Sequence, residues 1–178
     1  MAVSLACALA IEEQLGEKAT RQPTMMAGHS LGEYTALAVA GVLSVADTAR
    51  LVSARGELMQ DAFDRNPGTM AAVLGLDEMT MEEISRETGT YVSNVNTAEQ
   101  IVISGDRLLV AQALDLASAR GAKKVIPLRV GGAFHSALME PAIEGLAEAV
   151  ESLRFRDPTV PIVANCTGKP LTKGDDIK

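Results

Sequence analysis

Apolar positions along the chain change spacing several times, and each change predicts a new element. Residues 3–16 are apolar on most faces of a helix, so we expect a helix that ends at Gly16 and is buried against a sheet. The short apolar run 24–27 predicts a buried strand, and the Ala- and Leu-rich stretch 31–40 predicts a helix after it. The order is therefore helix, strand, helix.

A second long helix is predicted from Val45 to about Phe63. Ser44 and Asp47 stand at its start in an arrangement similar to a capping box. The tripeptide Asn66-Pro67-Gly68 is a strong turn signal and ends the helix.

The next part of the chain predicts a small domain. Strands are expected at 69–75, 91–95, 101–104 and 123–130, and helices at 80–88 (capped by Thr80 with Glu83) and 106–120. The order strand, helix, strand, strand, helix, strand is the split βαβ or ferredoxin-like order. We therefore predict a small domain over 67–130, inserted in a larger α/β domain formed by 1–66 and 131–178.

The larger domain resumes with a Gly-rich loop at 131–136, a helix over 137–153 and a strand at 160–164. Only two strands remain for its sheet, which is fewer than a parallel sheet needs to cover its helices. We expect a fragment whose core is incomplete because pieces are missing at both ends; completion by neighbouring chains is the alternative.

Charge and cysteine content narrow the function classes. The 178 residues carry 16 basic and 23 acidic side chains, a net charge of -7, which argues against nucleic-acid binding. Cys7, in a buried-looking helix, and Cys166 lack the spacing of a disulfide framework or metal site, so we expect free thiols in the cytoplasm and no metal. The apolar start lacks the basic region of a signal peptide, and no stretch is long enough to span a membrane.

The pentad Gly-His-Ser-Leu-Gly, residues 28–32, lies between a predicted strand and a predicted helix and is typical of a nucleophile elbow. We expect a strained turn at Ser30, with glycine required at 28 and 32 because side chains there would collide. The N–H of Leu31 at the helix start would face an oxyanion. The alternative is a Gly-rich turn in which Ser30 is an ordinary helix N-cap.

A serine nucleophile needs a base, and the chain has two histidines. His29 is adjacent to the serine and must point away, so we expect it to stabilise the elbow locally. His135, in the Gly-rich loop, is the predicted base. The alternative for His135 is a structural histidine or a helix N-terminal residue.

Other polar residues have two interpretations each. Arg55, near the apolar face of its helix, is either a surface residue with a buried stem or a clamp for a substrate carboxylate. Glu33 is explained as a partner of the helix dipole. Asn94, Asn96 and Gln100 lie around a strand turn, where turn formation alone would explain them.

Together these residues carry a family resemblance that extends along essentially the whole chain. It rests on four motifs: Gly28-His-Ser-Leu-Gly-Glu33, Arg55-Gly56, Asn94-x-Asn96-x-x-x-Gln100 and Ala133-Phe-His-Ser-Ala-Leu-Met139. In them the chain resembles the malonyl-CoA:acyl carrier protein transacylases, the acyltransferases of fatty-acid and polyketide synthesis. The resemblance implies an α/β-hydrolase-like core with an inserted ferredoxin-like (βαββαβ) small domain.

The resemblance also implies a chemistry. Ser30 would take a malonyl group from malonyl-CoA as an ester and pass it to the phosphopantetheine thiol of acyl carrier protein, with His135 as base and then acid. Arg55 would pair with the malonyl carboxylate, and Phe134 resembles the residue of malonyl-selective members. Asn96 and Gln100 match positions near the ligand. The implied protein is a cytoplasmic enzyme without a permanently bound cofactor.

Two parts of the family pattern have no counterpart here: an amino-terminal Gly-Gln-Gly loop that completes the oxyanion hole, and a carboxy-terminal part that orients the histidine. A serine esterase or thioesterase with the same elbow, and an inactive fragment that only binds carrier protein, are the alternatives. The basic residues of the small domain would offer acyl carrier protein a landing site, unless they form only a solvated face: Arg120, Lys123, Lys124 and Arg129.

Overall fold

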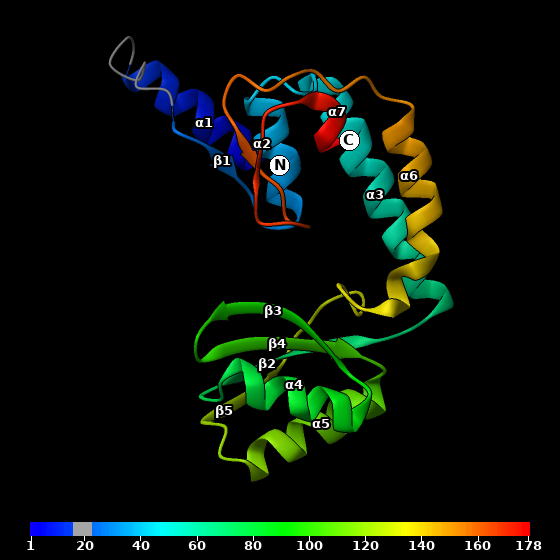
Figure 1. Cartoon of the computed structure of the whole chain (residues 1–178). Helices are drawn as coiled ribbons and strands as arrows, with labels where there is room; N and C mark the ends of the chain where they lie inside the picture. Colours follow the sequence, from blue (N-terminus) through cyan, green and yellow to red (C-terminus); the bar gives the residue numbers. More distant parts are fainter. Residues whose placement is uncertain (16–22) are drawn as a thin grey trace. The chain divides into compact units, whose positions relative to one another are not determined.

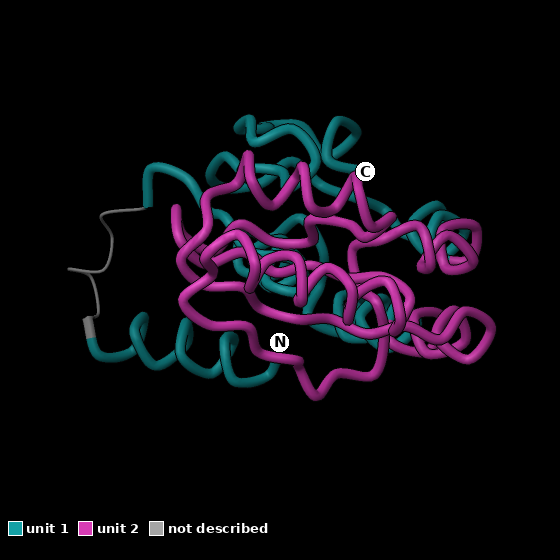
Figure 2. The backbone as a smooth tube through the Cα atoms, turned by 90° about the horizontal axis from the view of Figure 1, so that it is seen from below, with its two compact units in different colours: residues 1–55, 146–178 teal, residues 56–145 magenta. Residues whose placement is uncertain are grey.

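The computed structural model describes residues 1–15 and 23–178, so the predicted helix end at Gly16 lies outside the described residues. The chain is a mixed α/β protein whose elements are shown in Figure 1. It divides into two compact units, coloured in Figure 2: residues 1–55 with 146–178, and residues 56–145.

The first unit contains a small sheet. Strand β1 (Met26–Ala27) pairs in parallel with β6 (Ile162–Val163), which pairs antiparallel with β7 (Pro170–Leu171). Two short helices belong to the same unit, α2 (Leu31–Val39) and α7 (Gly174–Ile177). The strands near 24–27 and 160–164 are thus confirmed in shortened form, whereas β7 has no strong sequence signal because it is only two residues long.

Two further helices run from one unit into the other along the chain: α3 (Val45–Arg65) and α6 (Ile143–Glu151). The start of α3 is as predicted, since Ser44 Oγ accepts a hydrogen bond from the Asp47 N–H (3.0 Å) and donates one to Asp47 Oδ2 (2.7 Å). The predicted helix over 137–153 is divided, because a 3₁₀ helix η2 (Ala137–Ala142) containing Pro141 precedes α6.

The core of the first unit lies between α2, the start of α3 and β6. Its buried members come from these elements and the loop after α2: Ala36, Leu37, Ala40, Val42, Leu43, Leu51 and Ile162. This packing fixes the helix that follows β1, and with it the turn between them.

Helix α1 (Ala2–Leu15) is not buried, so the prediction of burial is wrong. Val3 is 78% exposed and Leu9 65%, and Cys7 and Cys166 are exposed free thiols. The physical reason is the size of the sheet. An apolar helix is buried only where another element covers it, and the described sheet of this unit has three strands of two residues each.

The second unit contains a four-stranded antiparallel sheet in the order β3–β4–β2–β5. Its elements follow one another along the chain as β2 (Thr69–Leu74), α4 (Glu78–Thr88), β3 (Tyr91–Thr97), β4 (Gln100–Gly105), α5 (Arg107–Ala119) and β5 (Lys124–Pro127). All six are predicted elements, although their ends differ by up to three residues. The strand predicted over 123–130 is shorter and ends at Pro127, although the Leu128 N–H still donates to the Met70 carbonyl of β2 at 2.9 Å.

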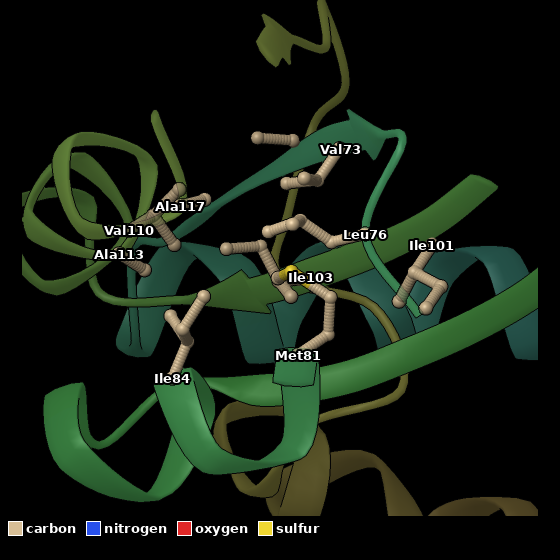
Figure 3. Close-up of a cluster of buried hydrophobic side chains, with 10 residues drawn as sticks. Val73, Leu76, Met81, Ile84, Ile101, Ile103, Val110, Ala113 and Ala117 are labelled. Carbon is tan, nitrogen blue, oxygen red and sulfur yellow. The ribbon is translucent and has the colours of Figure 1, made fainter. Parts of the chain in front are cut away.

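Period-two alternation along β2 and β4 gives the sheet two apolar faces. One face packs on α4 and α5, through Met81 and Ile84 of the first helix and Val110, Ala113 and Ala117 of the second (Figure 3). The other face contains Met70, Ala72 and Val102, and Phe134 packs against it. The loop that carries Phe134 is thereby fixed on the sheet.

Helix α4 begins earlier than predicted. Asp77, not Thr80, is its N-cap, because Asp77 Oδ1 accepts a hydrogen bond from the Thr80 N–H at 2.8 Å. Asp106 caps α5 in the same way through the N–H of Leu108 (2.8 Å). Among the helices described, none has the length and apolar content to cross a membrane.

Candidate active site

Ser30 lies in the turn between β1 and α2, with φ 47° and ψ -107°. A positive φ in a residue with a side chain costs on the order of 1–3 kcal/mol, so the turn is strained. The Gly32 N–H donates to the His29 carbonyl (2.8 Å) and the Glu33 N–H to the Ser30 carbonyl (3.2 Å). Ser30 makes no side-chain capping bond, so the interpretation of an ordinary N-cap is wrong.

The two glycines of the pentad differ. A Cβ on Gly28 would overlap the carbonyl group of Gly32 and the backbone nitrogen of Glu33, which confirms that this position requires glycine. The same expectation for Gly32 is wrong, since a Cβ there would meet no heavy atom within 4 Å. Strand and helix approach each other through Gly28, whereas Gly32 borders an open groove with Met26 and Val39.

Arg55, on α3, lies against the serine. Its Nη2 donates a hydrogen bond to Ser30 Oγ at 3.0 Å, and its Cζ is 5.7 Å from the centre of the Tyr34 ring. No carboxylate among the described residues pairs with this guanidinium. Arg55 is therefore a half-buried cation whose charged end lies beside the serine hydroxyl.

The Tyr34 phenol is held neutral next to this cation. Burial raises the pKa of Tyr34 above its usual value of 10.0, and the charge of Arg55 opposes this rise only in part. Arg55 thus lies over a neutral aromatic ring, which favours a cation without neutralising its charge. The positive charge remains available to an anionic group brought to Ser30.

Leu31 is the first residue of the nine-residue helix α2. N–H groups in the first turn have no acceptor within the helix, and the helix dipole makes this end positive. The site can therefore offer a donor to an oxyanion, a positive helix end and a guanidinium around one hydroxyl.

Asn165 completes the elbow, although it is not among the site residues predicted from the sequence. Its Oδ1 accepts from the Ser30 N–H (3.0 Å), its Nδ2 donates to the Gly28 carbonyl (2.7 Å) and its own N–H donates to Glu33 Oε1 (2.9 Å). Glu33, predicted only as a dipole partner, thus also holds this loop. The available signal was an asparagine shortly after a predicted strand, which becomes informative only once β6 is known to neighbour β1.

His135 and Phe134 belong to the second unit, in the loop before η2. His135 has φ 57°, one of two positive values among described residues other than glycine. Ser136 follows it and caps η2, accepting from the Leu138 N–H at 3.3 Å and donating to the Ala133 carbonyl at 2.6 Å. The Phe134 carbonyl accepts from Ser93 Oγ at 3.1 Å. Both sides of His135 are therefore held by hydrogen bonds.

Asn94, Asn96 and Gln100 lie in strands of the second unit, not in the turn, so turn formation does not explain them. Asn94 is opposite Val102, and Asn96 lies where the register of β3 and β4 shifts. Of the predicted site residues, the structure brings Ser30, Leu31 and Arg55 together in the first unit. His135, Phe134, Asn96 and Gln100 belong to the second.

The expected basic landing site is weaker than predicted, because acidic side chains neutralise part of it. Arg120 pairs with Glu83 (3.5 Å) and with Glu87, and Lys123 pairs with Glu99 (2.8 Å). Two of the four basic residues are therefore compensated locally. The described residues contain no cluster of His, Cys, Asp and Glu suited to a metal ion.

The sequence was compared with protein families, and the structure and sequence with individual known proteins. The model of a family described as the acyl transferase domain matches residues 2–175. The malonyl CoA-acyl carrier protein transacylase of Escherichia coli K12 is 45% identical over 170 residues, covering 93% of this chain and 54% of that protein. The chain therefore spans about half the length of the curated relatives it matches.

Two solved structures are similar in both sequence and fold. The acyl-carrier-protein-S-malonyltransferase of Bartonella henselae has a TM-score of 0.86 and 42% identity, covering 94% of this chain and 55% of the other. A malonyl-transacylase in complex with its type II polyketide synthase acyl-carrier protein has a TM-score of 0.88 and 40% identity, covering 97% of this chain and 57% of the other. The resemblance found in the sequence is confirmed.

Proposed function

The chain belongs to the acyl transferase domain family, and from this membership we propose that its protein transfers a malonyl group from malonyl-CoA to the phosphopantetheine thiol of acyl carrier protein. The observation that carries the proposal is at Arg55. Its guanidinium has no carboxylate partner among the described residues and lies 3.0 Å from the hydroxyl of a strained elbow serine. The names of similar proteins, malonyl transacylases, support the same substrate.

The first half of the reaction forms an ester. Ser30 Oγ attacks the thioester carbonyl while His135 accepts the hydroxyl proton, and the Leu31 N–H donates to the resulting oxyanion. The C–S bond then breaks, and the proton leaves with coenzyme A as its thiol. In the second half the phosphopantetheine thiol gives its proton to His135 and attacks the ester, and Ser30 recovers its proton. The pairing of Ser30 with His135 is part of the proposal.

Substrate selection follows from the free carboxylate of malonyl. The fork of Arg55 suits a bidentate pair with it, whereas an acetyl group offers no partner. By the family resemblance, Phe134 favours malonyl over its methylated analogue, and Asn96 and Gln100 lie near the ligand. No permanently bound cofactor is needed for this chemistry.

The finer fold belongs to the same proposal. We infer an α/β-hydrolase-like core from residues 1–66 and 131–178, incomplete in this chain, and a ferredoxin-like small domain over 67–130. The strand order β3–β4–β2–β5 supports the second assignment, since it is the order of that fold. A cytoplasmic role in fatty-acid biosynthesis agrees with the free thiols of Cys7 and Cys166.

The test is intact-protein mass spectrometry of the full-length protein mixed with malonyl-CoA, beside Ser30→Ala. We expect a gain of one malonyl group that the variant lacks and that added acyl carrier protein removes. An adduct of the same size on Ser30→Ala would refute the proposed nucleophile.

A second arm separates malonyl transfer from a general esterase with the same elbow. Arg55→Ala should slow malonyl loading by about 10- to 100-fold, which corresponds to the loss of one charge-assisted hydrogen bond. It should slow acetyl loading much less. Arg50→Ala on the same helix, which removes an exposed pair with Asp47, is the matched control. Equal losses with malonyl and acetyl would exclude Arg55 as a carboxylate clamp.

A further inference from the structure

We propose that Asn165 is a positioning residue that holds the nucleophile elbow in its strained conformation, and that Glu33 places Asn165. The Asn165 side chain bonds to backbone groups of Ser30 and of Gly28, and its own N–H bonds to the Glu33 side chain. These three bonds contact the elbow before, at and after the serine. This inference rests on the proposed function in one respect only, which is the use of malonyl-CoA as the acyl donor.

The sheet explains why an asparagine this far along the chain reaches the elbow. In the parallel pair β1–β6, Ala27 lies opposite Val163, so the segments that follow the two strands leave the sheet at the same edge. Ser30 is the third residue after β1, and Asn165 is the second after β6. The two residues are therefore close in space although they are 135 positions apart in the sequence.

The loop that carries Asn165 is itself fixed. It joins β6 to β7, and the Ala164 N–H donates to the Lys169 carbonyl (3.1 Å) while the Gly168 N–H donates to the Ala164 carbonyl (2.8 Å). Gly168 has φ 64°, which a glycine adopts without strain. A closed hairpin loop of this kind presents Asn165 in one position.

The chemistry of the side chain matches its task. The elbow exposes one donor, the Ser30 N–H, and one acceptor, the Gly28 carbonyl, and a carboxamide supplies the complementary acceptor and donor from one planar group. Because the Ser30 N–H is used in this way, the oxyanion must be bound by the next amide, that of Leu31. Asn165 thus also determines which N–H faces the reaction.

Removal of the side chain should act on the serine and not on substrate binding. Without its two bonds the backbone at Ser30 can relax toward negative φ, which moves Oγ away from the line of attack. A displacement of this kind costs up to about 100-fold in rate. The maximal rate of acylation should therefore fall by about 10- to 100-fold in Asn165→Ala, with the KM for malonyl-CoA within a factor of about two.

The experiment uses the full-length protein and two readouts: the rate of Ser30 labelling by a fluorophosphonate, and the rate of malonyl-ester formation across malonyl-CoA concentrations. The variants are Asn165→Ala, Glu33→Ala and Glu33→Gln, with Cys166→Ser in the same loop as the matched control. Glu33→Gln should retain the wild-type rates because its amide oxygen accepts the same bond, whereas Glu33→Ala should lose rate in the same direction as Asn165→Ala.

The double variant separates positioning from general stability. If Glu33 acts by placing Asn165, then adding Glu33→Ala to Asn165→Ala should reduce the rate no further than Asn165→Ala alone. Glu33→Ala should still lower the melting temperature in that background. Fluorophosphonate labelling needs no malonyl-CoA, so a wild-type protein that labels but forms no malonyl ester would refute the proposed function and still test Asn165. Wild-type labelling by Asn165→Ala, a raised KM at unchanged maximal rate, or additive losses in the double variant would each overturn the inference.

Discussion

At the scale of single residues, the elbow depends on one glycine more than on the other. Gly28 lies where the backbone of strand β1 approaches the backbone of α2, and a methyl group there would overlap Gly32 and Glu33. Gly32 has a similar place in the motif but has space around it. Equal status in a sequence motif therefore does not mean equal packing.

This difference predicts that glycine-to-alanine substitutions at positions 28 and 32 change the free energy of unfolding in opposite directions. Gly28→Ala should lower the free energy of unfolding by about 1–3 kcal/mol or more, because backbone atoms must move. Gly32→Ala should raise it by about 0.5–1 kcal/mol, since alanine favours the first turn of α2. Denaturant unfolding measures both values. Equal destabilisation by the two variants would contradict the packing found at Gly32.

Individual residues also show how far the sequence predicts the site. Ser30 was identified because its signal is local: two glycines, a strand before and a helix after. For Arg55 the periodicity gave the correct helix face but left its role open, since its partner is 25 positions away. The role of Asn165 cannot be predicted from local pattern, because it depends on which strand lies beside β1.

At the scale of elements, the local sequence pattern predicts the order of helices and strands better than the residues at which they begin and end. The four strands and two helices from β2 to β5 follow from alternation and helical spacing alone. The sequence places the start of α4 too late because Thr80 resembles a cap, whereas Asp77, three residues earlier, accepts the Thr80 N–H. Long-range packing, which sequence periodicity does not report, decided the exposure of α1.

The Asp77 cap predicts a pH dependence of stability. Its hydrogen bond from the Thr80 N–H lowers the pKa of Asp77 below 3.8. A carboxyl with a lower pKa in the folded state contributes its full stability above the unfolded value, and loses it as the pH falls through the folded value. Asparagine accepts the same bond without titrating, so Asp77→Asn should weaken the fall in melting temperature between about pH 4 and pH 2.

Thermal melts of the two proteins across this range measure the effect. Asp61→Asn, on the exposed side of α3, is the matched control because Asp61 caps no helix. A steeper acid loss in Asp77→Asn than in the wild type would contradict the assigned cap.

At the scale of the whole molecule, the two units differ in how complete their cores are. The main core of the second unit is drawn from residues between Ala71 and Val125, all inside that unit. In the first unit Val3, Leu9 and Ile11 of α1 are exposed, and the sheet consists of three very short strands. Stability is therefore expected to be unequal along the chain.

Residues 56–145 should accordingly fold without the rest of the chain, because their buried cluster needs no other residue. We expect a single cooperative thermal transition with circular dichroism of a mixed α/β protein. Ile103→Ala, at a fully buried position of β4, should lower the free energy of unfolding by about 2–5 kcal/mol, whereas Leu108→Ala, 75% exposed on α5, should change it by less than about 0.5 kcal/mol. A non-cooperative transition, or equal effects of the two variants, would mean that the second unit depends on the first for its core.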